Sequence, residues 1–218
     1  MNEIETVAPT PTRVQSLLLW AAVLMPIVYF GAQLAAAPFY PKYSFVNNMA
    51  SLLGSAASRR PFVFNDGAMT TGILGLSGAV GLFLCLKRRS GLWRALTGLC
   101  VVANGVLSLK AGMYPMPDPR HASWQFLLFP TVLAPFVLLL ATWRFDVRLR
   151  WYLIVDNLAL LTLLPSVIGV SSVPAGILQR LFALIVLVPP GAVAGWLVLR
   201  KRPAYSGSRV GVSVPTSG

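Results

Sequence analysis

Apolar residues are grouped along the chain into blocks of about 20 residues, which short polar stretches separate. A helical block of that length crosses a hydrocarbon layer of about 30 Å, because an α-helix rises about 1.5 Å per residue. The pattern predicts an all-α fold, a six-helix transmembrane bundle with a short interfacial helix in the first outward loop. The predicted spans are Val14 to Ala37, Phe64 to Leu86, Trp93 to Tyr114, His121 to Trp143, Trp151 to Val170, and Gly176 to Leu199.

The six spans are expected to form one transmembrane domain, residues 14–199, between two tails. We expect residues 1–13 to be a cytoplasmic tail and residues 200–218 to be a flexible cytoplasmic tail. Composition supports a membrane protein, since 56% of the residues are hydrophobic and 11% are charged. An average soluble domain is about 45 to 50% apolar and about 25% charged. A water-soluble fold of this size is therefore excluded.

The formal net charge is +12, which in a soluble protein would suggest nucleic-acid binding. Here the basic residues flank the apolar blocks, so we expect membrane lipids as partners and no nucleic acid. Counted over alternate connections, twelve Lys and Arg residues lie on one side and six on the other. Basic loops resist translocation. The count therefore predicts a multi-pass protein of the cell membrane with both termini cytoplasmic.

The first outward connection, Pro38 to Val63, is about 26 residues long, whereas links between helices usually have about 2 to 8 residues. We predict a short helix over Ser44 to Ala57, lying at the outer interface. It is expected to end before Arg59, because the residue preceding Pro61 is biased away from the helical conformation.

Glycine and proline mark two further features of the spans. Glycine recurs every three residues in the second span, which predicts that a neighbouring helix approaches its backbone closely. Prolines in the first and last spans are expected to kink or interrupt those helices and to free carbonyl groups. The residues concerned are Gly72, Gly75, Gly78 and Gly81 in the second span, Pro26 in the first, and Pro189 and Pro190 in the last.

Polar residues inside the spans are concentrated in the outer halves and at the outer rim. Such residues are costly in a membrane and are functional candidates for that reason. We therefore predict an outward-facing polar cavity that binds a lipid headgroup or small amphiphile, with Arg180, Lys110 and His121 as cationic contacts. The predicted ligand-binding residues are Asn48, Ser51, Asn65, Lys110, Asp118, His121, Gln179 and Arg180.

Several polar side chains also have structural interpretations. Lys110 can extend its amine to the interface, or it can pair with Asp66 or Asp118. Asp118 and Pro119 fit the cap and first position of the fourth span. Asp156, in the inner half, is expected to pair with Arg148 or Arg150, and Cys85 and Cys100 are expected to be small buried hydrophobic residues.

Two alternative functions stay open at this point. The protein could be a membrane-embedded lipid hydrolase or transferase that uses His121 as a base, with Ser51 and Asp118 completing a triad. It could also be a small-solute transporter. A zinc site needs three or four ligands, and the outer rim offers one His, no Cys and two Asp. We therefore expect no metal and no cofactor.

Several short motifs lie on the outward side: Asn48 to Gly54, Pro61 with Phe64-Asn65, Gly112 with Pro115, Asp118 and His121, and Gly176 with Gln179-Arg180-Leu181. They resemble the family called domain of unknown function 998, and the similarity extends from Val14 to Leu199. The resemblance implies a six-span membrane protein without an established reaction. Leu52 stands where the family usually has an acidic residue.

Overall fold

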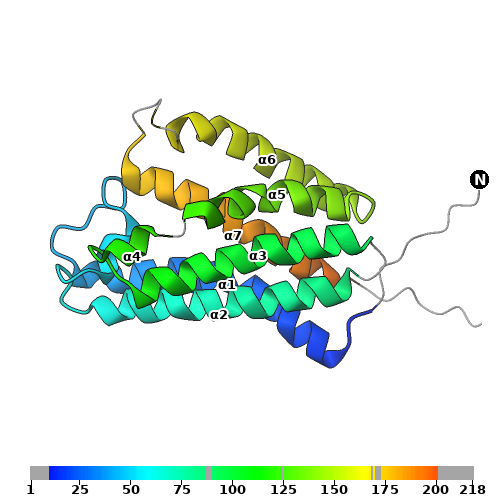
Figure 1. The fold of residues 1–218 in the computed structure, drawn as a ribbon, viewed down its shortest axis with the longest axis horizontal. Coiled ribbons are helices and arrows are strands. Elements are labelled where there is room, and N and C mark those ends of the chain that lie inside the picture. The colour runs from blue at the N-terminus through cyan, green and yellow to red at the C-terminus, as the bar shows by residue number, and fades with distance from the viewer. Residues whose placement is uncertain (1–9, 87–89, 124, 168, 170–172, 201–218) are drawn as a thin grey trace, which may run out of the picture.

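The computed structural model describes residues 10–86, 90–123, 125–167, 169 and 173–200, and the regular structure within them is helical. Six long helices run along one axis of an elongated bundle (Figure 1). This confirms the predicted all-α bundle. The elements are α1 (Arg13–Ala36), η1 (Ala37–Phe39), η2 (Ala50–Gly54), α2 (Pro61–Cys85), α3 (Gly91–Met113), α4 (Pro119–Ala122), η3 (Gln125–Leu127), α5 (Leu128–Thr142), α6 (Val147–Val167) and α7 (Ala175–Leu199).

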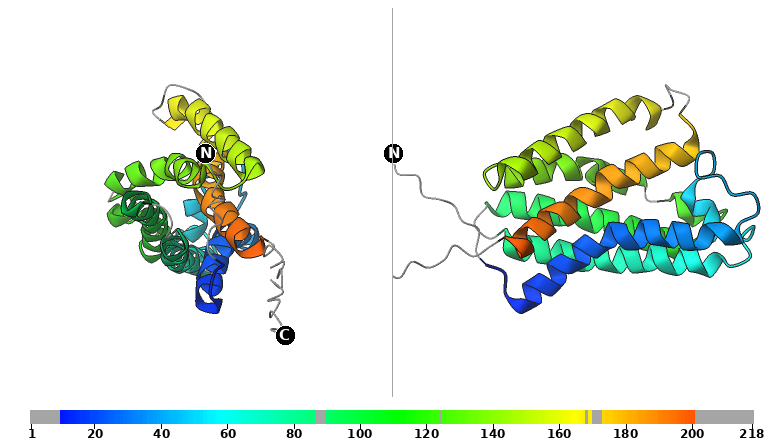
Figure 2. Two further views of the ribbon diagram at one scale, coloured as in Figure 1. Left: turned by 90° about the vertical axis from the view of Figure 1, so that its right-hand side faces the viewer. Right: turned by 180° about the vertical axis from the view of Figure 1, so that it is seen from behind.

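Five stretches of the described chain are long and apolar enough to cross a membrane, so the chain is a multi-pass membrane protein. The sixth long helix, α6, runs beside α5 and α7 between the same two ends of the bundle (Figure 2). It is less apolar because it contains Arg148, Arg150 and Asp156. The five stretches are Arg13–Phe39, Pro61–Cys85, Gly91–Met113, Pro119–Thr142 and Ala175–Leu199.

Two connections, residues 37–60 and the described part of 114–127, lie at one end of the bundle, which we call the capped end (Figure 1). The predicted cytoplasmic tails lie outside the described residues, except for residues 10–13 and 200. The basic run at residues 87–89, which contributed to the predicted orientation, also lies outside them. The orientation of the bundle therefore stays a prediction.

The glycine row of α2 allows α1 and α3 to pack closely on either side of it. A Cβ atom at Gly72 would lie 2.6 Å from the backbone nitrogen of Leu109 in α3. At Gly78 it would lie 2.9 Å from the Cα atom of Ala22 in α1. Real side chains do not tolerate such distances, so the predicted close approach is confirmed. The full row is Gly72, Gly75, Gly78 and Gly81.

The predicted span from His121 to Trp143 corresponds to the candidate span Pro119–Thr142, but its helix is not continuous. α4 ends at Ala122, Ser123 is extended with φ −69° and ψ 167°, and α5 begins at Leu128. Pro130 has no N–H group to continue an upstream helix, but it is tolerated within the first turn of a new one. The interruption leaves the carbonyl group of Ser123 open to another donor.

The prolines within α1 and α7 do not interrupt these helices. α1 runs continuously through Pro26, and α7 runs through Pro189 and Pro190. α1 bends visibly along its length (Figure 2). A proline removes the hydrogen bond to the carbonyl four residues earlier. The predicted release of carbonyl groups therefore holds without a break in the helix.

A short helix does form in the first connection, as predicted, but it is shorter than Ser44 to Ala57, because the helical structure within that range is η2, Ala50–Gly54. The side chain of Asn48 accepts a hydrogen bond from the Ser44 N–H at 2.9 Å, and the Ser44 hydroxyl accepts one from the Asn47 N–H at 3.2 Å. Such local bonds compete with the hydrogen bonds of a helix. η2 itself is anchored by Ala50 and Leu53, whose side chains are fully buried.

Candidate functional site

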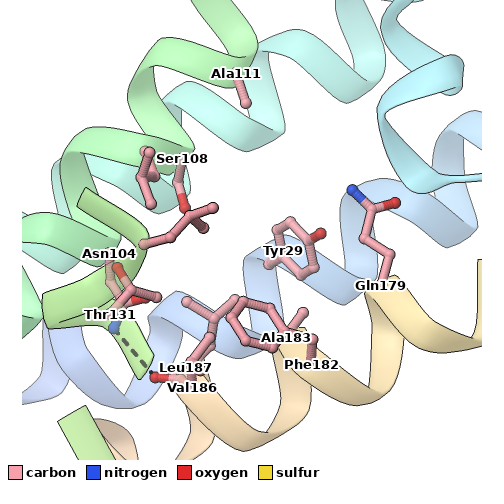
Figure 3. Close-up of a pocket in the computed structure, with 12 residues that line it drawn as sticks. Tyr29, Asn104, Ser108, Ala111, Thr131, Gln179, Phe182, Ala183, Val186 and Leu187 are labelled. Carbon is pink, nitrogen blue, oxygen red and sulfur yellow. Dashed lines mark hydrogen bonds between the residues drawn. The ribbon is translucent and has the colours of Figure 1, made fainter. Parts of the chain in front are cut away.

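A cavity of about 300 Å³ lies among α1, α3, α5 and α7. The side chains around it come from all four helices and face a common space (Figure 3). Most of the lining residues are Ala, Leu, Phe or Val, and no charged side chain is among them. Small-molecule sites begin at about this volume and are typically apolar with a few polar groups. The polar lining residues are Tyr29, Asn104, Ser108, Thr131 and Gln179.

Thr131 lines this cavity, and its hydroxyl group is buried. Its side chain is 2% exposed, and Oγ1 has no hydrogen-bond partner within the protein. By contrast, the Thr142 hydroxyl on the same helix donates to the Leu138 carbonyl at 2.7 Å. Leaving a buried polar group unpaired costs about 1 to 3 kcal/mol. The Thr131 hydroxyl is therefore a candidate hydrogen-bonding group beside the cavity.

Asn104 forms part of the cavity wall and has a structural partner. Its Nδ2 donates to the carbonyl oxygen of Val186 at 3.2 Å, a bond that Figure 3 shows as a dashed line. Four residues after Val186, Pro190 lacks the N–H group that would otherwise bond to this carbonyl. Asn104 therefore satisfies a carbonyl group that Pro190 leaves free.

Gln179 connects the cavity with the capped end. Its Oε1 accepts a hydrogen bond from the backbone N–H of Ala50, in η2, at 2.6 Å. The hydroxyl group of Tyr29 lies on the side of the cavity that faces Gln179 (Figure 3). Tyr29 and Gln179 therefore form a polar side of the cavity beneath η2.

Arg180 holds the first connection against the start of α7. Its Nη1 donates to the carbonyl oxygens of Phe45 at 2.7 Å, Asn48 at 3.0 Å and Gly176 at 2.8 Å, and its Nη2 donates to the hydroxyl group of Tyr43. Burial raises the pKa of Tyr43, and the nearby Arg180 partly offsets that rise. The guanidinium group is thus used mainly to bind the protein's own backbone.

Gly176 makes this approach of the first connection possible. A Cβ atom there would lie 2.6 Å from the carbonyl oxygen of Val46 and 2.7 Å from those of Phe45 and Asn48. The Val46 carbonyl also accepts a hydrogen bond from the Ile177 N–H at 3.1 Å. The first turn of a helix has free N–H groups, and here the loop satisfies one of them.

Ser51 and Asn65 join the segments of the capped end to one another. The Ser51 hydroxyl donates to the sulfur atom of Met116 at 3.3 Å, which links η2 to residues 114–127. Asn65, on α2, donates from Nδ2 to the carbonyl oxygen of Gly54 at 3.1 Å. Both polar side chains therefore hold η2 in place.

Lys110 forms hydrogen bonds to Ser123, which lies between α4 and α5. Its ammonium group donates to the carbonyl oxygen of Ser123 and, at 3.2 Å, to its hydroxyl group. Its side chain is only 5% exposed. The ion pair that the structure gives for Asp118 is with Arg120. A pair of Lys110 with Asp66 or Asp118 stays a prediction.

Asp118 caps α4, as the sequence predicts. Its carboxylate accepts a hydrogen bond from the Arg120 N–H at 2.8 Å and forms an ion pair with the Arg120 guanidinium group at 2.7 Å. The hydrogen bonds from Arg120 hold the pKa of Asp118 below its ordinary value. His121 lies in the same short helix, and its Nδ1 contacts the Tyr114 carbonyl oxygen at 2.7 Å.

The eight predicted ligand-binding residues thus lie near the capped end, and each has a protein partner. Only Gln179 also lines the cavity. Their role in ligand binding stays a prediction. Sequence reasoning did not include Asn104 and Ser108 in the predicted site. It missed Tyr29 and Thr131, because a tyrosine or threonine within an apolar span gives no signal of its own.

The proposed triad members have separate partners. Ser51 bonds to Met116, Asp118 to Arg120, and His121 to Tyr114. Within the described ranges, no group of three or more His, Cys, Asp or Glu side chains could hold a metal ion. The hydrolase, transferase and transporter alternatives stay predictions without a supporting geometry.

Asp156 is not paired as the sequence analysis expected. Among the residues that the structure describes, neither Arg148 nor Arg150 forms an ion pair with it. Arg150 instead donates to the carbonyl oxygen of Trp143 at 3.5 Å. The backbone N–H groups of Arg148 and Leu149 bond to the carboxylate of Asp146. The two arginines belong to the first turn of α6, and Asp156 lies more than one turn further along.

Comparison with known proteins identifies a family but no characterised relative. No curated protein and no solved structure matches the chain. The family model described as protein of unknown function (DUF998) matches residues 20–196, from the first half of α1 to the end region of α7. That match extends over all six long helices and the whole capped end, and the chain therefore belongs to the DUF998 family of proteins of unknown function.

Proposed function

We propose that this membrane protein binds a small amphiphile, or an uncharged part of a membrane lipid, in the cavity among α1, α3, α5 and α7. The observation that carries the proposal is the buried, unpartnered hydroxyl of Thr131 in a mostly apolar wall. An occupant with an apolar body would fit this wall, and one hydroxyl, amide or ester group would bond to Thr131. Because no charged side chain lines the cavity, an ionised group there would be unfavourable.

We further propose that the capped end faces outward from the cell membrane and that both termini are cytoplasmic. The basic connections support this orientation. Arg94, Arg144, Arg148 and Arg150 lie at the end opposite the capped end. The cavity would then lie in the outer half of the bilayer, within reach of lipids of the outer leaflet.

In this proposal the predicted ligand-binding residues act in two ways. Gln179 contacts the occupant, because it lines the cavity. Arg180 is a positioning residue that holds the first connection over that side of the cavity. Asn48, Ser51 and Asn65 support the same connection. Lys110, Asp118 and His121 organise the neighbouring segment 114–127.

The test is to purify the protein in native-lipid particles and to identify small molecules bound to it by mass spectrometry. Thr131→Val keeps the shape of the side chain and removes the hydroxyl. Losing one hydrogen bond of about 0.5 to 1.5 kcal/mol should lower retention of the occupant by about two- to tenfold. Ala183→Leu places extra atoms in the cavity wall and should abolish retention.

Thr142→Val is the matched control. It removes a buried hydroxyl from the same helix, but Thr142 does not line the cavity. We expect this variant to retain the same compound as the wild-type protein. The proposal is wrong if the wild-type protein carries no specific compound, or if all four proteins carry it equally.

A further inference from the structure

Asp156 lies in the middle of α6, nine residues after Val147 and eleven before Val167. At about 1.5 Å per residue, its Cα atom is roughly 14 Å from the start of the helix. α6 runs beside α5 and α7 between the same ends of the bundle (Figures 1 and 2). The carboxyl group therefore lies at the depth of the central parts of the neighbouring apolar helices.

No basic group of the packed helices faces this carboxyl group. α5 contains no ionisable residue, and the only one in α7 is Arg180, which binds the first connection at the capped end. On α6 itself, Arg148 and Arg150 lie in the first turn, and Tyr152 lies one turn before Asp156. In the part of the chain that the structure describes, Asp156 forms no ion pair.

One oxygen of the carboxyl group is also enclosed. Asp156 Oδ2 is buried and has no hydrogen-bond partner in the protein. The side chain lies at the edge of the buried face of α6, which contains Leu153, Asn157 and Leu160. An ionised carboxylate in such surroundings would have no countercharge among the described residues, and its Oδ2 would have no donor. Isolated buried charges of this kind are strongly unfavourable, and groups in this situation become neutral instead.

We propose that Asp156 is a proton-binding site inside the membrane-embedded bundle. The carboxylate takes up one proton from water and forms one O–H bond, so that the group is a neutral carboxylic acid at neutral pH. It releases that proton only when a base, or water that enters between the helices, reaches it. This site is separate from the cavity, since α6 contributes no lining residue to it. The inference therefore does not depend on the proposed amphiphile.

The test is infrared difference spectroscopy of the full-length protein in lipid vesicles, with spectra compared between about pH 5 and about pH 9. Ordinary aspartate side chains are ionised throughout this range. The wild-type protein should show the carbonyl stretch of a protonated carboxylic acid at neutral pH. That band should shift in heavy water. It should vanish in Asp156→Asn, whose amide resembles the neutral acid in shape, and should persist in Asp66→Asn, which removes an exposed carboxylate.

Three outcomes would overturn the inference. One is the absence of a protonated-acid band from the wild-type protein at neutral pH. Another is an unchanged band in Asp156→Asn. The third is a carboxylate band that responds to sodium or potassium, which would make Asp156 a cation ligand instead. Asp156→Glu provides a second variant, because it should retain a protonated-acid band at a shifted frequency.

Discussion

The hydrogen bond between Asn104 and the Val186 carbonyl gives a prediction that couples two helices. Asn104→Leu keeps a similar side-chain size and removes the donor to this carbonyl. A hydrogen bond is worth about 0.5 to 1.5 kcal/mol, and bonds between membrane helices average about 0.6 kcal/mol. Asn104 is only 3% exposed, so the carbonyl would be left without water. We therefore expect a loss of about 1 to 2 kcal/mol in the free energy of unfolding.

The same bond should matter less when the backbone can replace it. Pro190→Ala supplies an N–H group four residues after Val186, which can donate to the same carbonyl oxygen. In that background Asn104→Leu should cost only a few tenths of a kcal/mol. The double-mutant cycle should thus show a coupling energy of about 1 kcal/mol between Asn104 and Pro190.

The assay is reversible unfolding in mixed micelles for the wild-type protein, both single variants and the double variant. A single transition with equal slopes is required for the comparison. The reasoning would be refuted if Asn104→Leu lowered the free energy of unfolding equally, within about 0.4 kcal/mol, in the wild-type and Pro190→Ala proteins. The two substitutions would then act independently. The carbonyl would then have no need of Asn104.

Three further predictions concern packing, the capped end and charge. Gly78→Ala should destabilise the bundle by about 1 to 3 kcal/mol in the same assay, because its Cβ would meet Ala22, whereas Gly31→Ala, with open space, should not. Arg180→Ala should speed amide hydrogen exchange of residues 43–50 by tenfold or more, and Arg59→Ala, which removes an exposed cation at the same end, should leave it unchanged. Asp118 should titrate below about 3.9, its unfolded value, as followed by carboxyl NMR. The contribution of Asp118 to stability is thus present above its unfolded pKa and is lost as the pH falls through its lower folded pKa. A measured pKa of Asp118 at or above about 3.9 would contradict the contact with Arg120.

The long helices could be predicted from sequence because the thickness of the hydrocarbon layer sets the length of each apolar block. The glycine row of α2 was equally readable, since small residues at a helical spacing have one main use in membrane bundles. The break after Ala122 was not readable from hydropathy, because the residues around it, from Pro119 to Gln125, mix polar and apolar types without a clear signal. It coincides with the bond from Lys110, on α3, to Ser123, which follows α4 and so belongs to a different part of the secondary structure.

The candidate site was only partly predictable for a similar reason. The polar residues near the capped end were recognised, but sequence cannot show whether a polar side chain faces a cavity or bonds to the protein itself. Arg180 illustrates this, since its guanidinium group contacts three backbone carbonyls of the chain. Thr131 illustrates the opposite case. Its hydroxyl became notable only when the structure showed it buried without a partner beside a cavity.

The proposal of an amphiphile site is tested most directly by an experimental structure of the protein in native-lipid particles, at a resolution that reveals small molecules. We predict elongated non-protein density among α1, α3, α5 and α7, with a polar group within hydrogen-bonding distance of Thr131 Oγ1. Side chains that close the cavity, or density for water alone beside Thr131, would contradict the proposed function.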